Sequence, residues 1–335
     1  MEKLEMQNIN DTLNVTNETS ISDSKRRKNK KSKIKKKMSK KRFWITMSSV
    51  VIMGFIFGLG IGKYIIGGKL DPNRYNFAVS ALVDNVDDIK KEAKNKNQIK
   101  LGATKCCVLA FDKTFNYEDV KIVGKGEVIA QVGPVKAKQT IDSLTIRNGK
   151  NLFIETISIS QYVQALNRNY VNDGTIKQYG GKINGNTITW DGQNYNTGEN
   201  DIKTMKDYQT RYGATLFEYM TYIVSSKTVV TESEVQQDEN GNYTFSLTLD
   251  KSKSVVNYVK AMKDTGGLKD YPDFTSDPKI TLLIDADYRI LKFESEEQYT
   301  ANVGIRAKSN ATLTNIFTYD GNFAIPALTD NSTKN

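Results

Sequence analysis

The sequence predicts an α+β fold in which a curved antiparallel β-sheet packs with a few helices and is preceded by a single transmembrane helix. An uncharged apolar run of 20 residues, from Phe43 to Gly62, predicts the transmembrane helix. Apolar residues that alternate with period two between residues 120 and 319 predict the strands. The turn dipeptides Asn148-Gly149 and Asn240-Gly241 interrupt this alternation. Since two-residue turns join only antiparallel strands, the sheet should be antiparallel.

The predicted membrane anchor covers residues 43–66. At about 1.5 Å of rise per residue, a 20-residue helix is roughly 30 Å long, which matches the hydrocarbon core of a bilayer. Trp44 and Tyr64 lie near its two ends, where aromatic rings favour the membrane–water interface. The length of the run and of the preceding region favours an uncleaved anchor over a signal peptide.

Glycines recur every four residues on one face of this helix, at Gly54, Gly58 and Gly62. This spacing allows two helices to approach closely, so it predicts a homodimer. The alternative explanation is that glycine is simply frequent in membrane helices.

The charge distribution predicts the orientation of the anchor. Residues 25–42 contain 13 Lys and Arg and no acidic residue, whereas residues 1–24 are acidic and polar. We therefore expect residues 1–42 to form a disordered cytoplasmic tail and the domain after the anchor to lie outside the cell. The residues expected to contact anionic lipid headgroups and fix this topology are Lys35, Lys36, Lys37, Lys40, Lys41 and Arg42. No aromatic residue interrupts the run, which argues against a nucleic-acid site.

Composition excludes several kinds of chemistry. The chain has no His, so no Ser-His-Asp, Cys-His or HExxH site can form within it. Its net charge of +10 comes almost wholly from the basic run. The two cysteines, Cys106 and Cys107, are adjacent. They are either a vicinal redox pair or, as we favour, small apolar residues of a buried strand with the sequence CCVLAF. No cofactor, metal site or catalytic residue is expected.

Residues 71–329 should form one extracytoplasmic α+β domain, and residues 330–335 a tail. Asp71-Pro72 is a typical helix start. Apolar residues then follow at helical spacing, namely Ala78, Leu82, Val86, Ile89 and Ala93. A second helix should carry Val255, Val259 and Met262 and end at Gly266-Gly267. Residues 215–224 could form either a short helix or a strand.

The strands follow from alternation and turns. Residues 120–132 alternate, with Gly124 and Gly126 as an expected bulge or bend. Hairpins are predicted at Asn148-Gly149, Asp191-Gly192 and Asn240-Gly241. Further strands are predicted in ITLLID, YRILKFE and TLTNIFTY.

Two clusters of carboxylate and amide residues are considered as candidate sites. Asp238, Asn240 and Asn242 have the spacing of calcium ligands, but Tyr243 occupies the position that needs Gly, so a hairpin turn explains them better. Glu294, Glu296 and Glu297 are interpreted as a solvated strand edge.

A family resemblance rests on the order of elements and on three segments, WDGQNY, SVVNYVKAMKDTGGLKDYPDF and KITLLIDADYRILKFESEEQY. By these features the chain resembles membrane-anchored envelope proteins of low-GC Gram-positive bacteria with the half-barrel fold of the LolA and LppX group. The resemblance covers roughly residues 75–322. It implies a curved sheet that wraps around helices and can enclose a hydrophobic pocket for acyl chains. LppX carries a lipidated cysteine where this chain has an apolar anchor, and no ligand-lining position can be carried over.

Three functional hypotheses follow. The first is a single-pass, non-catalytic binding protein of the cell membrane that holds a lipid or other amphiphile in its concave sheet. The second is an assembly partner in an envelope complex that dimerises through its transmembrane helix. The third, a hydrolase, would have to use Asp, Glu, Lys, Ser or Tyr, since His is missing.

Overall fold

The computed structural model describes residues 72–161, 164–198, 201–218, 222–265, 268–302, 306–327 and 332–333. The predicted cytoplasmic tail and membrane anchor lie outside these residues. Within the described ranges, no helix combines the length and the apolar character needed to span a bilayer.

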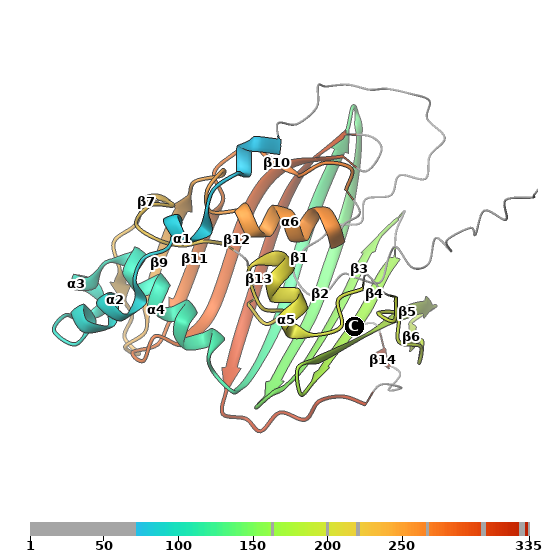
Figure 1. The fold of residues 1–335 in the computed structure, drawn as a ribbon, viewed down its shortest axis with the longest axis horizontal. Helices are drawn as coiled ribbons and strands as arrows, with labels where there is room; N and C mark the ends of the chain where they lie inside the picture. The colour runs from blue at the N-terminus through green and yellow to red at the C-terminus, as the bar shows by residue number, and fades with distance from the viewer. Residues whose placement is uncertain are drawn as a thin grey trace, which may run out of the picture. The chain divides into compact units, whose positions relative to one another are not determined.

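One large antiparallel sheet dominates the domain (Figure 1). Its strands are β1 (Asp119–Val132), β2 (Val135–Asn148), β3 (Asn151–Ser160), β4 (Gln164–Asn172), β5 (Thr175–Asn184), β6 (Thr187–Trp190), β7 (Val229–Glu232), β8 (Gln236–Gln237), β9 (Tyr243–Leu249), β10 (Asp273–Phe274), β11 (Lys279–Ile284), β12 (Ile290–Asn302), β13 (Arg306–Tyr319) and β14 (Ser332–Thr333). The strand order is β14-β6-β5-β4-β3-β2-β1-β13-β12-β11-β9-β7, and every pairing is antiparallel, as predicted.

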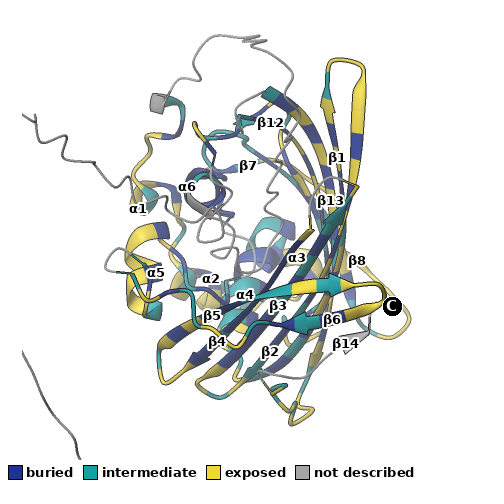
Figure 2. Ribbon diagram, turned by 90° about the vertical axis from the view of Figure 1, so that its right-hand side faces the viewer, coloured by how far each residue is buried: buried dark blue, intermediate teal, exposed yellow. Residues whose placement is uncertain are grey.

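Helices cover one face of this sheet, and the sheet curves toward them (Figure 2). They are a 3-10 turn η2 (Pro72–Tyr75), α1 (Val79–Leu82), α2 (Val86–Ala93), α3 (Gln98–Leu101), α4 (Ala103–Phe115), α5 (Met205–Tyr212) and α6 (Val256–Thr265). A main hydrophobic core runs from Tyr75 to Phe317 and combines α4 and α6 with the inner face of the sheet. Two smaller apolar clusters, around Leu82 and around Trp190, lie beside this main core. The coarse α+β prediction is confirmed.

The central strands pair without interruption. β1 pairs with β13 from Val120–Tyr319 to Gln131–Lys308, with no shift of register at Gly124 or Gly126. The predicted bulge is therefore wrong. Gly126 instead allows close packing, since an added Cβ would lie 3.0 Å from the Thr312 carbonyl oxygen.

The hairpin signals had mixed outcomes. Asn148-Gly149 joins β2 to β3 and Asn240-Gly241 joins β8 to β9, as predicted. The hairpin expected at Asp191-Gly192 is wrong, because the tight turn lies before β6, at Gly185, whose φ of 61° suits glycine. After β6 the chain runs back beside β5, where the Tyr195 amide donates to the Gln178 carbonyl oxygen at 2.8 Å.

The first predicted helix is broken. Its apolar spacing continues through residues 78–93, but Val83 and Asn85 have extended backbone conformations that separate α1 from α2. The Asn85 side chain caps α2 by accepting from the Asp87 amide at 3.0 Å. Leu82 packs with Ile223, so the shared spacing reflects two helices that pack in different places.

The buried strand expected at Cys106 and Cys107 is also wrong, because this segment lies in α4. A short apolar run cannot be assigned to strand or helix by periodicity alone. Within residues 215–218 and 222–224 the structure has neither helix nor strand, and α5 was not predicted. The helix that carries Val255, Val259 and Met262 is confirmed, since Val259 and Met262 lie in α6 and Val255 directly precedes it.

We predict that Phe293→Ala destabilises the domain by about 3–5 kcal/mol, because it removes a large side chain from a packed core. Phe293 is 2% exposed and packs against Phe111 of α4. Equilibrium unfolding of the detergent-solubilised chain, followed by circular dichroism, measures this loss. Gln298→Ala, at an exposed position of the same strand, should change stability by less than about 0.5 kcal/mol. Equal effects of the two substitutions would contradict the assignment of faces.

Candidate functional site

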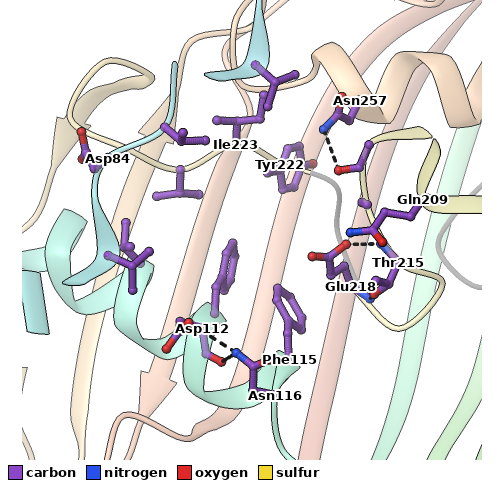
Figure 3. A pocket seen from close by; sticks show the side chains of 18 residues that line it. Asp84, Asp112, Phe115, Asn116, Gln209, Thr215, Glu218, Tyr222, Ile223 and Asn257 are labelled. Carbon is purple, nitrogen blue, oxygen red and sulfur yellow. Dashed lines mark hydrogen bonds between the residues drawn. The ribbon is translucent and has the colours of Figure 1, made fainter. Parts of the chain in front are cut away.

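A cavity of about 480 Å³ opens within the helical layer (Figure 3). Its walls come from α1, α2, α4 and α5, from residues 213–218 and 222–224, and from the start of α6. Apolar side chains line one part of it, namely Val79, Val83, Val86, Val108, Phe111, Phe115, Ile223 and Val224. The polar lining residues are Asp84, Asp112, Asn116, Gln209, Thr215, Glu218, Tyr222 and Asn257.

The periodicity of α4 builds the apolar wall. Val108, Phe111 and Phe115 are spaced three and four residues apart, which places them on one side of the helix. The Phe111 and Phe115 rings contact each other with centroids 5.2 Å apart. Both rings are only partly buried, so they present apolar surface to the cavity.

The opposite wall follows from the end of α5. A capping box between Thr204 and Asp207 starts this helix, and Gly213 ends it with a φ of 77°. A Cβ at Gly213 would lie 2.8 Å from the Asn257 side chain, so glycine allows the chain to pass close to α6. Phe217 then packs against Phe115 and against the Arg147 guanidinium, which holds this segment on the sheet.

The polar groups of the cavity are three carboxyl groups and five amide or hydroxyl side chains that both donate and accept hydrogen bonds. Of the described residues that line it, none is Lys or Arg. Asp112 pairs with Lys90 at 2.8 Å, and Asp84 accepts from the Ser226 amide at 2.7 Å. Burial raises the pKa of Glu218, which accepts from the Thr215 amide. The Oδ1 atom of Asn257 is buried and has no hydrogen-bond partner in the described part of the chain.

Behind the cavity wall lies a buried carboxyl group. The Tyr222 ring lines the cavity, and its hydroxyl donates to Glu297 of β12. The Tyr258 hydroxyl donates to the other Glu297 oxygen at 3.3 Å, and Tyr299 also lies nearby. Burial raises the pKa of Glu297 to about 7, because the charged form loses its hydration. Burial also raises the pKa of Tyr222 well above its usual range.

Glu297 corrects the interpretation of the acidic residues of β12. Glu294 and Glu296 lie on the partly or fully exposed face, as a solvated edge would. Glu297 is only 3% exposed and shares the inner face with Phe293 and Tyr299. Its position within the apolar alternation of β12 was the signal that could have identified it.

The other candidate residues fall into three groups. The predicted anchor and headgroup residues lie outside the described residues. They are Trp44, Gly54, Gly58, Gly62, Tyr64, Lys35, Lys36, Lys37, Lys40, Lys41 and Arg42. Cys106 and Cys107 are buried free thiols, and burial raises the pKa of Cys106 to about 12, which suits small apolar residues better than a redox pair. Asp238 accepts from the amides of Asn240 and Asn242 at 2.9 and 2.8 Å, as expected of a turn.

No metal-binding cluster of three or more Cys, Asp or Glu occurs within the described ranges. No known family model matches the chain, and no curated protein matches it.

Solved structures align with it at low similarity. One is an outer membrane lipoprotein-sorting protein domain from Vibrio parahaemolyticus, at 8% identity over 68% of this chain and 95% of that domain, with a TM-score of 0.24. Another is a DUF1329 family protein from Desulfovibrio piger, at 10% identity over 68% of this chain and 96% of that one, also with a TM-score of 0.24. A third is a β-barrel-like protein of domain of unknown function DUF1849 from Brucella abortus, at 8% identity over 60% and 98% of the two chains and a TM-score of 0.23. Similarity at this level carries no weight for function, which has to be inferred from this chain's own geometry.

We predict that Glu297 makes the domain less stable as the pH rises from about 4.5 to about 7. The folded pKa lies above the value of 4.5 expected when unfolded, so folding favours the protonated acid. Below pH 4.5 Glu297 makes its full contribution to the free energy of unfolding. About 3 kcal/mol of this contribution is lost once the pH exceeds the folded pKa of Glu297.

Unfolding of the native chain and of Glu297→Gln between pH 4 and 8 tests this expectation. The pH dependence should be smaller in the variant by that amount. Glu296→Gln, at an exposed position of the same strand, should retain the native dependence. If Glu297→Gln retains the native dependence as well, the carboxyl is not protonated in the folded state.

Proposed function

We propose that this chain is a single-pass, membrane-anchored binding protein of a bacterial envelope, with its N-terminus in the cytoplasm and its sheet domain outside the cell. In this proposal the domain holds an amphiphile and performs no catalysis. The observation that carries the proposal is the cavity beside α4, which joins an apolar wall to a polar lining with three carboxyl groups and no Lys or Arg among the described residues. Its volume of about 480 Å³ falls in the usual range for small-molecule sites.

The lining restricts the chemistry of the ligand. Valine and phenylalanine side chains favour a hydrocarbon portion, since burying apolar surface is favourable. Asp84, Asp112 and Glu218 would repel an anionic headgroup and would accept hydrogen bonds from a donor. The best fit is therefore an amphiphile with a short apolar chain and a cationic or hydrogen-bond-donating head.

A binding role agrees better with these residues than an enzymatic one does. The chain has no His, and Asp112 and Asp84 already pair with Lys90 and Ser226. Anchoring follows from the apolar run at residues 43–62. Dimerisation through Gly54, Gly58 and Gly62 stays a prediction of the sequence.

We predict that octylammonium binds the full chain in lipid nanodiscs and that Val83→Trp weakens this binding at least tenfold. Val83 lines the cavity and is 46% exposed, so an indole can enter the cavity without disturbing the core. Isothermal titration, with empty nanodiscs as the blank, measures the affinity.

Ile99→Trp is the matched control, because Ile99 is 49% exposed and does not line the cavity. Octanoate, which has the same chain length and the opposite charge, should bind more weakly than octylammonium. Unchanged affinity in Val83→Trp, or equal affinity for both amphiphiles, would refute the proposed site.

The proposed topology predicts that protease added to intact cells digests the sheet domain and leaves the basic tail protected. The excess of Lys and Arg before the anchor retains the N-terminus in the cytoplasm. Epitopes at the two ends of the chain report the cleavage, and inverted membrane vesicles should give the reverse pattern. A C-terminal epitope that survives in intact cells but not in inverted vesicles would place the domain in the cytoplasm.

A further inference from the structure

Three carboxylates line the cavity, and two of them already have protein donors for both oxygens. Asp84 accepts from the Ser226 amide at 2.7 Å with one oxygen and from the Ser226 hydroxyl at 2.8 Å with the other. Asp112 pairs with Lys90 at 2.8 Å and accepts from the Asn116 side chain at 3.3 Å. These two carboxylates therefore need no ligand to satisfy their hydrogen bonds.

Glu218, the third carboxylate, differs from both. Its Oε2 atom accepts from the Thr215 amide, whereas no described residue donates to its Oε1 atom. Burial raises the pKa of Glu218, although the bonds from Thr215 act in the opposite direction, and none of the described Lys or Arg residues offsets this effect. The Oε1 atom thus remains available to a donor from outside the chain.

The side chain of Glu218 reaches the space of the cavity. It is only half-buried, it lines the cavity, and it points into the interior beside Phe115 (Figure 3). Asp84 lies at the opposite end of the cavity, and its neighbours Val83 and Val86 contribute aliphatic lining there. A ligand that spans the cavity would therefore place its head at Glu218 and its tail against these valines.

We propose that Glu218 selects the head of the ligand and that this head is a primary ammonium, which donates N–H hydrogen bonds to Oε1. This inference rests on the proposed function, because it requires that the cavity holds an amphiphile. A primary ammonium combines a positive charge with three N–H donors. A hydrogen bond between a charged donor and a charged acceptor is among the stronger ones in proteins, so one available carboxylate oxygen can determine the choice of head.

Three other cations fit less well. A quaternary ammonium has no N–H group, so its methyl groups would cover Oε1 without supplying a hydrogen bond. A guanidinium binds a carboxylate best through two parallel bonds, but Oε2 of Glu218 already accepts from Thr215. A divalent metal ion needs several oxygen ligands, and the described segments hold no cluster of three or more Cys, Asp or Glu that could supply them.

Isothermal titration of the full chain in nanodiscs with octylammonium and octyltrimethylammonium tests this selectivity. The two probes have the same chain length and charge, but only the first has N–H donors. The native chain should bind octylammonium about tenfold more tightly than octyltrimethylammonium, and Glu218→Gln should lose this preference because it replaces the charged acceptor. Glutamine can still accept from the Thr215 amide through its own oxygen.

Two controls separate the head site from other effects. Glu239→Gln removes the same charge at an exposed position outside the cavity, so it should bind both probes like the native chain. Octanol has the same chain length and a neutral head. It should bind Glu218→Gln and the native chain with equal affinity, which would show that the cavity of the variant is intact.

Several outcomes would overturn the proposal. If Val83→Trp weakens octylammonium binding and Glu218→Gln does not, the cavity binds the amphiphile but Glu218 does not select its head. Equal native affinity for the two ammonium probes would show that N–H donors are not recognised. A loss of octanol affinity in Glu218→Gln as large as the loss for octylammonium would make the role of Glu218 structural. If octylammonium does not bind the native chain, the proposed function fails together with this inference.

Discussion

The fold depends on the unbroken antiparallel register of its longest strands. β12, β13, β1 and β2 pair over almost their whole lengths without a bulge. Because side chains alternate along a strand, this register decides the face on which every residue lies. A slip of one position would move Phe293, Leu313 and Ile122 from the core to the solvent, so the hydrophobic core and the register stabilise each other.

Within this register the composition of the inner face changes across the sheet. β9, β11 and β12 place Phe245, Leu282 and Phe293 against the helical layer and supply much of the core. From β13 to β5 the same face mixes buried hydroxyl and amide residues with core residues such as Leu313, Val128 and Ile154. These apolar neighbours supply the stability that allows this part of the sheet to carry buried polar groups.

How much of this could be predicted depends on the range of the deciding interactions. The turn at Asn148-Gly149 and the alternation of β13 are local, and they were predicted correctly. The CCVLAF segment is apolar in either a strand or a helix, and only its packing in the core made it part of α4. The hairpin at Gly185 was missed because Asp191-Gly192 offered an equally good local turn.

The site was harder to predict than the fold, because its residues are distant in the sequence. The cavity brings Val83, Phe115 and Glu218 together from three separate segments. No spacing rule connects them, and only α4 contributes a periodic pattern. Glu297 did have a local signal, because it is a charged residue on the same parity of β12 as Phe293 and Tyr299. Alternation alone identifies such a residue as an exception, but its partners emerge only when the strands are paired.

The helical layer and the sheet place different constraints on a binding site. The cavity walls are short helices and loops, such as α1 and residues 213–218, and few backbone hydrogen bonds fix their positions. Such walls can adjust to ligands of different shape. The inner face of the sheet lies on strands hydrogen-bonded on both sides, so its side chains keep a fixed spacing.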